Sequence, residues 1–297
     1  MVFLRTQRKR GVAIPRRRRS GALPPAILLA LIWMILVVVL ALFAEIIAPH
    51  DFAEVNLRKR LIAPYIFGGE DPAHLLGTDH LGRDLFSRVL VAIRISLLVA
   101  LVGTVVGAVA GTLLGFVAAH LRGWAESAIT LLIDFQASLP FMILAMAVLA
   151  FYSYNLPLFL ALMGIYGWEK YARIARGMAL SAQEQGYVRA LRGFGAPTRR
   201  IYLQHILPNI AGALIVNMTV NFPDTILAES SLSFLGLGIQ PPLTSLGSLL
   251  GQGRAYLLDA WWIAVTPGVI IFLTTLSMSL LGDWVRDHLD PTLKRRV

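Results

Sequence analysis

The sequence predicts an all-α protein that crosses a membrane six times, and three observations lead to this fold class. First, 57% of the 297 residues are apolar and only 15% are charged, with a mean hydropathy of +0.68. Ordinary soluble domains carry roughly 25% charged residues, so the composition excludes a soluble enzyme. Second, the apolar residues form runs of about 20, long enough to cross roughly 30 Å of hydrocarbon. Third, Lys and Arg are concentrated in alternate connecting segments.

The apolar runs divide the chain. The expected spans are residues 26–48, 96–119, two within 128–168, 206–228 and 260–281. Residues 128–168 hold one charged side chain, Asp134, and as one helix they would be about 60 Å long, so a fold-back is expected at 152–157. The expected organisation is a basic tail at 1–25, a first span at 26–48, an extracytoplasmic segment at 49–92, a transmembrane core at 93–283 and a tail at 284–297.

Basic residues indicate on which side of the membrane each connection lies. Eight of the 27 Lys and Arg residues fall within the first 19 positions, with no acidic residue among them. Cytoplasmic segments are enriched in Lys and Arg. With the N-terminus inside, 20 basic residues lie in cytoplasmic segments and 6 in extracytoplasmic ones, so both termini are expected inside. The net charge of +10 is thus a topology signal, and no nucleic-acid partner is expected. The first span is too long for a signal peptide and is expected to be retained.

Four glycines in the second span define one face of a helix. Gly103, Gly107, Gly111 and Gly115 recur at every fourth position. Residues four apart lie above one another on a helix, and glycine lets a neighbouring backbone approach closely. We therefore expect these four residues to form a helix-packing surface.

The chain lacks the motifs of common catalytic and metal sites. It contains no cysteine, and none of its four lysines follows a glycine, so no phosphate-binding loop is present. The six histidines show no ligand spacing in the sequence. Catalysis, a bound cofactor and a metal site are therefore not expected in this chain.

Polar residues within the spans are candidates for a polar path through the membrane, because charges there are costly and are often functional. The candidates are Asp134, Asn217, Asn221, Asp224 and Glu229. Pairing of Asp134 with an arginine at the interface is an equally good interpretation. A proton-coupled secondary transporter would also need such acids, and it remains the alternative function.

The polar connection at residues 169–205 predicts a helix with one apolar face. Ser181 and Glu184 have the spacing of a capping box, which predicts a helix start at Ser181. Tyr187, Leu191 and Phe194 would then share a face of that helix.

Two glycines and a proline set the end of this helix. Gly193 and Gly195 are expected to end it, and Pro197 to open a second short helix at 198–204. The apolar face could lie in the membrane interface or dock into a groove on a partner.

A known motif has similar spacing. Arg189-Ala190-Leu191, Gly195 and His205-Ile206-Leu207-Pro208 resemble the EAA loop of ATP-binding-cassette (ABC) importer permeases, in which Glu-Ala-Ala precedes a glycine and Ile-x-Leu-Pro. Arg189, Leu191 and His205 depart from the general pattern.

Three further segments, at 77–88, 230–242 and 281–291, resemble the second permease subunit of the dipeptide/oligopeptide/nickel branch. In the first of them, Asp79, Arg83, Asp84 and Arg88 alternate in sign, which favours internal ion pairing over capture of a substrate. Leu246 stands where this branch commonly has tryptophan, and Ala92 where it usually has glycine.

The resemblance implies a type I ABC importer permease in the inner (plasma) membrane of a bacterium. Its partners would be a homologous permease in a heterodimer, two ATPase subunits that bind ATP and Mg²⁺, and an extracytoplasmic solute-binding protein. The implied ATPase-docking region is residues 176–208, with these contact residues: Glu184, Tyr187, Val188, Arg189, Ala190, Leu191, Phe194, Gly195, Leu207 and Pro208. Peptides are the expected substrates, with nickel, opines and glycosides as alternatives. A membrane-embedded structural subunit remains a third possible function.

Overall fold

A computed structural model describes residues 23–152 and 155–289, and the described residues contain helices and no β-strand. The elements in chain order are α1 (Pro25–Leu42), α2 (Ala44–Ile47), η1 (Leu57–Lys59), η2 (Tyr65–Phe67), α3 (Leu85–Leu121), α4 (Gly123–Ser138), α5 (Phe141–Tyr152), α6 (Leu156–Ile165), α7 (Trp168–Gln183), α8 (Gly186–Gly193), α9 (Thr198–Arg200), η3 (Ile201–Ile206), α10 (Leu207–Phe234), α11 (Leu246–Gly253), η4 (Arg254–Tyr256) and α12 (Trp262–Leu289). The predicted basic tail lies outside the described residues up to position 22, and the predicted C-terminal tail begins inside α12 and lies outside them from position 290.

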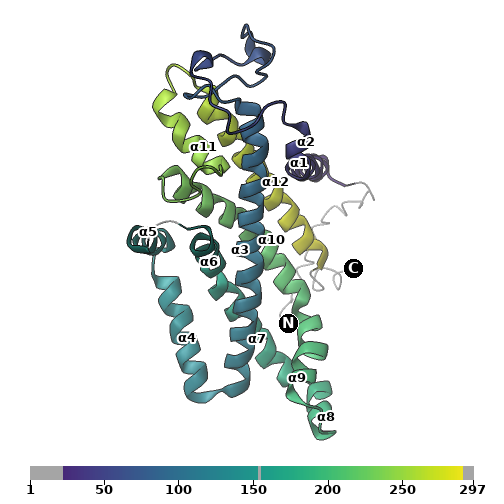
Figure 1. Cartoon of the computed structure of the whole chain (residues 1–297). Coiled ribbons are helices and arrows are strands. Elements are labelled where there is room, and N and C mark those ends of the chain that lie inside the picture. Colours follow the sequence, from purple (N-terminus) through teal and green to yellow (C-terminus); the bar gives the residue numbers. More distant parts are fainter. Residues whose placement is uncertain (1–22, 153–154, 290–297) are drawn as a thin grey trace, which may run out of the picture.

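Helix α3 is the central element. Its 37 residues make it about 55 Å long, and α1, α4, α6, α7 and α10 pack beside it, whereas α12 packs on α1, α10 and α11 (Figure 1). α1, α10 and α12 flank one side of α3, whereas α4 and α5 lie on the other. The segment 49–84 and α11 form the upper end in this view, and α8 and α9 form the lower end.

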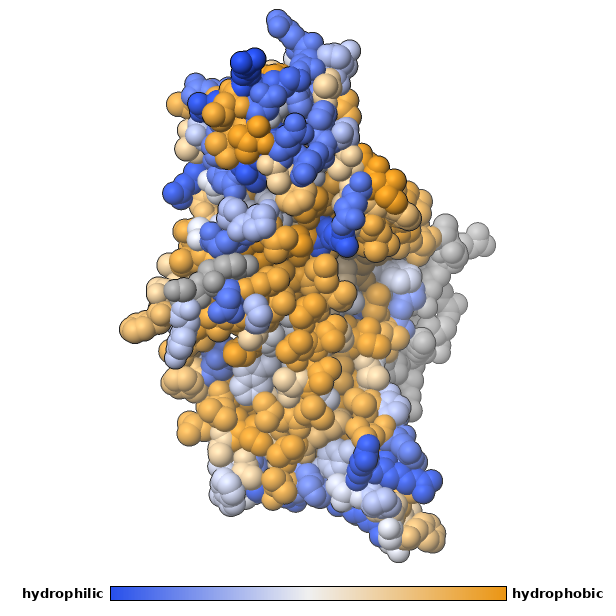
Figure 2. Space-filling model, in the orientation of Figure 1, coloured by the Kyte–Doolittle hydropathy of each residue, from blue (hydrophilic) through white to orange (hydrophobic). Residues whose placement is uncertain are grey.

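Among the described residues, four helical segments are long and apolar enough to cross a membrane, namely α1, α3, the continuous stretch Thr198–Phe234, and α12. Helices α4 and α5 add a fifth candidate when they are taken together, although a bend of 91° separates them. Figure 2 shows a broad hydrophobic surface between two hydrophilic ends, as expected for a chain that lies in lipid.

The second span expected within 128–168 is divided in the structure. Helix α6 has only 10 residues, about 15 Å, and Gly167 at φ +81° separates it from α7. The chain then continues as a helix through residues expected to form a polar connection. α7 forms because its buried residues Tyr171, Ala172, Ala175 and Ala179 face α3. The sixth span stays a prediction.

The capping-box prediction at Ser181 is wrong. α7 continues to Gln183, and Glu184 caps its C-terminal end. The next helix, α8, begins at Gly186 with Gln185 as its N-cap. The small buried residues of α7 extend to Ala182, so tertiary packing outweighs the local capping signal.

The four glycines of α3 lie where α6 and α7 approach. A Cβ on Gly103 would lie 3.0 Å from the Cβ of Met163, and one on Gly107 would lie 3.0 Å from the Gly164 carbonyl oxygen. A Cβ on Gly115 would lie 2.5 Å from the Ala172 carbonyl oxygen. Gly111 faces Trp168 and Tyr171 in the same way. The two helical segments therefore pack backbone to backbone.

We expect Gly115→Ala to lower the free energy of unfolding by about 1–3 kcal/mol, because the added methyl group overlaps the α7 backbone. Thermal unfolding of the purified chain in detergent measures this. Gly177→Ala on α7 is the matched control, because a Cβ there meets no atom within 4 Å. Alanine favours a helix more than glycine does, so the control should be neutral or stabilising. Equal destabilisation by both substitutions would contradict the close approach.

Candidate functional site

The short helix α8 and its turn project from the lower end of the molecule (Figure 1). Phe194 caps α8, and Gly195 follows with φ +75°, the left-handed conformation that glycine adopts without strain. The Ala196 backbone N–H donates to the Leu191 carbonyl at 3.0 Å, and the Gly195 N–H to the Arg192 carbonyl at 3.0 Å. These two bonds form a Schellman motif, which ends the helix where the sequence predicts.

The side chains of α8 point in two directions. Val188 is fully buried in an apolar cluster with Ala179, Ile201 and Ile206, and Leu191 packs against that cluster. Phe194 is 88% exposed. The structure thus divides the predicted apolar face, with Leu191 partly inside and Phe194 outside.

The remaining residues predicted for this loop lie on α8 or next to it in the chain. The Tyr187 hydroxyl accepts a hydrogen bond from Asn209 Nδ2 at 2.8 Å. Arg189 donates to Glu184 at 2.6 Å, and both side chains are largely exposed. Ala190 is exposed, while Leu207 and Pro208 open α10 at the base of the loop.

Gln183 is a residue of this region that sequence reasoning missed. Its Nε2 donates to the Ala119 carbonyl of α3 at 3.2 Å and to the Tyr202 hydroxyl of η3 at 3.0 Å. Its Oε1 accepts from Arg192 of α8 at 2.8 Å. One buried amide therefore joins α3, α7, α8 and η3. The only signal in the sequence was a polar residue that directly follows the small residues Ser181 and Ala182.

A second polar group lies between α7 and α10. Lys170 Nζ is 3.2 Å from Asp224 Oδ2 and 3.2 Å from Asn221 Oδ1, and it lies 6.0 Å from the centre of the Tyr166 ring. The Lys170 and Asp224 side chains are 42% and 43% exposed, so the pair faces outward from this chain. Lys170 was not predicted, because its position was assigned to a polar connection.

Of the other polar residues predicted to line a path, Asn217 lies near this group, whereas Asp134 and Glu229 lie in different surroundings. Asn217, one turn before Asn221, is partly buried. Asp134 pairs with Arg173 at 3.4 Å on an exposed surface. Glu229 is completely buried and accepts hydrogen bonds from Ser96 at 3.1 Å and Ser233 at 2.7 Å. Its carboxyl group faces serine hydroxyls and no open surface.

The segment 77–88 contains a buried ion-pair network. Asp79 bonds to Arg83 Nε at 2.7 Å and to the Arg88 guanidinium, and Arg88 also contacts Gln252 at 3.2 Å. Burial acts to raise the pKa of Asp79, but the charges of Arg88 and Arg83 and the Arg83 backbone N–H outweigh it, so the pKa is lowered. The alternation of charges in this segment predicted internal pairing, which the structure confirms.

Comparisons with known proteins establish the family of this chain. Residues 111–295 match the family described as "Binding-protein-dependent transport system inner membrane component". The chain belongs to this family. The di/tripeptide transport system permease protein DppC of Pseudomonas aeruginosa is 39% identical over 266 residues, covering 89% of this chain and 87% of that protein.

Further relatives and a solved structure agree with this assignment. The glutathione transport system permease protein GsiD of Escherichia coli is 38% identical over 269 residues, covering 89% of this chain and 86% of that protein. The probable D,D-dipeptide transport system permease protein DdpC of Escherichia coli is 36% identical over 258 residues, covering 87% and 85%. The MetNI methionine ABC transporter, in an inward-facing conformation, matches with a TM-score of 0.55 and 18% identity over 68% of this chain and 96% of that chain, which shows the fold alone.

The chain is therefore an ABC importer permease of the peptide-transport family, a multi-pass membrane subunit that transports and is not an enzyme. The predicted resemblance is confirmed, and the proton-coupled alternative is set aside.

We expect Asp79→Asn to cost about 3–5 kcal/mol of stability, because it leaves the buried Arg88 without its charge partner. The lowered pKa means that the Asp79 carboxylate stabilises the fold above about pH 4, and that this contribution is lost as the pH falls through the folded-state pKa. Unfolding measured from pH 7 to pH 3 should show a smaller acid-dependent loss in the variant. Asp51→Asn, at an exposed position, is the control and should change stability by less than about 1 kcal/mol. An Asp79→Asn protein with wild-type stability would contradict this account.

Proposed function

We propose that this chain pairs with a homologous permease to form the translocation path of an importer for peptides or similar small solutes. The observation that carries this proposal is the 39% identity, over 89% of the chain, to a permease named for di- and tripeptides. The relatives named for glutathione and D,D-dipeptides support the same substrate class. An extracytoplasmic binding protein would deliver the solute.

The proposed arrangement has six crossings, with both termini in the cytoplasm of a bacterium and the chain in its inner membrane. In it, α6 and α7 together make the fourth crossing, because they run beside α3 and offer it a continuous packing face. The α8 loop and the segment 49–84 lie at opposite ends of α3, which is the separation that this topology requires.

Two ATPase subunits, which would bind ATP and Mg²⁺, are proposed to dock on residues 176–208. The exposed Phe194 would enter a groove on the ATPase, since an isolated exposed aromatic ring is a typical interface anchor. Movement of the ATPases would press on α8. Val188 and Gln183 would pass that movement to α3, α7 and α10, to which they are packed or hydrogen-bonded.

Lys170, Asn221 and Asp224, with Asn217 beside them, are proposed to line the path. A charge facing hydrocarbon costs about 2.5–3.5 kcal/mol, so an outward-facing ion pair at this depth favours a water-filled path between the two permeases. Asp134 lies on a separate exposed surface and would line the cytoplasmic mouth. Glu229 is too enclosed to touch a solute without a rearrangement.

The experiment that tests the function is co-purification of the tagged chain in mild detergent. Mass spectrometry should identify a second permease and ATPase subunits in fixed proportion. Phe194→Ser should lose most of the ATPase while keeping the second permease. Phe151→Ser is the control, because Phe151 on α5 is 90% exposed and far from α8. A chain that purifies alone, or equal ATPase recovery with both variants, would contradict the docking proposal.

We expect Asp224→Asn to reduce solute uptake at least about tenfold in proteoliposomes that contain all subunits, because it removes one of the two charges proposed to line the path. The double exchange Lys170→Asp with Asp224→Lys should recover much of the loss if the pair acts as a pair. Arg94→Gln breaks another exposed ion pair, with Glu45 at 2.6 Å, and should leave uptake near wild type. Unchanged uptake in Asp224→Asn would remove this pair from the path.

A further inference from the structure

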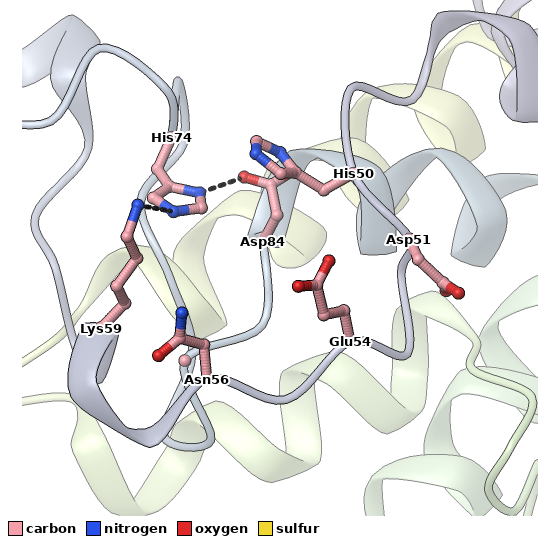
Figure 3. Close-up of a pocket in the computed structure, with 8 residues that line it drawn as sticks. His50, Asp51, Glu54, Asn56, Lys59, His74 and Asp84 are labelled. Carbon is pink, nitrogen blue, oxygen red and sulfur yellow. Dashed lines mark hydrogen bonds and ion pairs between the residues drawn. The ribbon is translucent and has the colours of Figure 1, made fainter.

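Two histidines and one aspartate converge in the extracytoplasmic segment. His50 follows α2, His74 lies in the loop before α3, and Asp84 is the N-cap of α3. His74 Nδ1 is 2.9 Å from Asp84 Oδ1, and His50 Nδ1 is 3.9 Å from Asp84 Oδ2. The rings are stacked with their centres 4.9 Å apart. Figure 3 shows both rings directed at the same carboxylate.

The hydrogen bonds of this cluster leave one nitrogen unused. Lys59 Nζ, which can only donate, lies 3.4 Å from His74 Nε2, so the ring proton of His74 is on Nδ1 and donates to Asp84. Asp84 also accepts from the Ser87 backbone N–H at 2.8 Å and the Ser87 hydroxyl at 2.7 Å. His50 Nδ1 is buried and has no hydrogen-bond partner among the described residues. A buried, unpartnered nitrogen that faces a carboxylate needs either a proton or a cation.

The surroundings favour a cation. The pocket beside the cluster is lined by Asp51, Glu54 and Asp84 against the single charge of Lys59. Figure 3 shows the Glu54 carboxylate directed into the pocket and Asp51 directed away from it. Asp71 lies on the far side of His74, with its Oδ2 3.9 Å from His74 Nε2 and 2.9 Å from Lys59 Nζ.

We propose that His50, His74 and Asp84 bind one divalent transition-metal ion of the Zn²⁺ type, with Glu54 or a water molecule as the fourth ligand. One ligand atom from each of the three residues lies within 4.8 Å of the others. A tetrahedral zinc ion with bonds of about 2.0–2.2 Å holds its ligand atoms roughly 3.3–3.5 Å apart, so a small inward movement of His50 completes the site. Imidazole and carboxylate ligands are those that zinc prefers.

Binding conserves the protons of the site. The ring proton of His74 moves from Nδ1, which takes the metal, to Nε2, where Asp71 can accept it. Lys59 gives up its bond to His74 and keeps its ion pair with Asp71. A carboxylate behind a metal-binding histidine is a common arrangement that orients the ring. The bound ion would link three parts of the chain: the residues that follow α2, the 60–76 loop and the first turn of α3.

The test uses the full-length chain with its partner subunits in detergent, carrying an affinity tag without histidines. After dialysis against Zn²⁺, elemental analysis should find one zinc ion per chain beyond the content of His50→Gln, and calorimetry should show affinity at least about tenfold weaker in that variant. His80→Gln is the matched control, because His80 lies in the same segment but stacks on Tyr256 at 5.3 Å. It should bind zinc as wild type does. With Co²⁺ in place of zinc, wild type should show the visible absorption of a tetrahedral site, and His50→Gln should not.

A wild-type chain without zinc, or equal binding by wild type and His50→Gln, would overturn the proposal. A second measurement on unchanged protein keeps it falsifiable if the variant fails to fold. Zinc should protect His50, whose side chain is 31% exposed, from a histidine-modifying reagent while leaving the modification of His80 unchanged. Modification of His50 at the same rate with and without zinc would also overturn the proposal.

Discussion

The close approach of α3 to α6 and α7 determines where most other elements lie. Lipid gives no hydrophobic driving force for helices to associate, so close packing between helices is one of the main contributions that hold them together. The four glycines of α3 provide that contact along its whole middle. The same contacts set the position and rotation of α7, which begins directly after the break at Gly167. Lys170, in the first turn of α7, therefore lies beside Asp224 of α10. The polar group thus depends on residues that carry no side chain.

Two buried residues connect the α8 loop to the long helices. Val188 anchors α8 in the inner apolar cluster, and Gln183 bonds to α3, α8 and η3. From Thr198 onward, α9, η3 and α10 form one continuous helical stretch that ends near Phe234. The apolar cluster around Val188 thus packs α8 against the continuous helical stretch that also carries Asn221 and Asp224. The same packing buries Val188 and part of Leu191 and leaves the Phe194 ring outside.

Periodicity and hydropathy in the sequence were sufficient to predict the helical class, the glycine face, the turn at Gly195 and the ion pairing of Asp79. They were not sufficient for α7, because its charges resemble those of a soluble connection. In the fold these charges meet distant partners: Lys170 with Asp224, Arg173 with Asp134, and Arg176 with Glu126. The convergence of His50 and His74 on Asp84 is hidden for the same reason, since no local spacing encodes contacts across a loop.

Different kinds of contact hold the two ends of the molecule in place. At the end formed by the segment 49–84 and α11, a buried pair joins Asp79 to Arg88 of α3, and Trp262 of α12 donates to the Thr78 carbonyl at 3.1 Å. A buried ion pair tolerates little displacement, because separating the charges leaves each desolvated and unpaired. At the opposite end, α8 is held by the apolar packing of Val188 and Leu191 and by hydrogen bonds of Tyr187 and Arg192. Because the contacts of Asp79 and Trp262 resist separation, the segment 77–88 stays fixed to the start of α3 and to α12, and in the proposed importer these elements would move together.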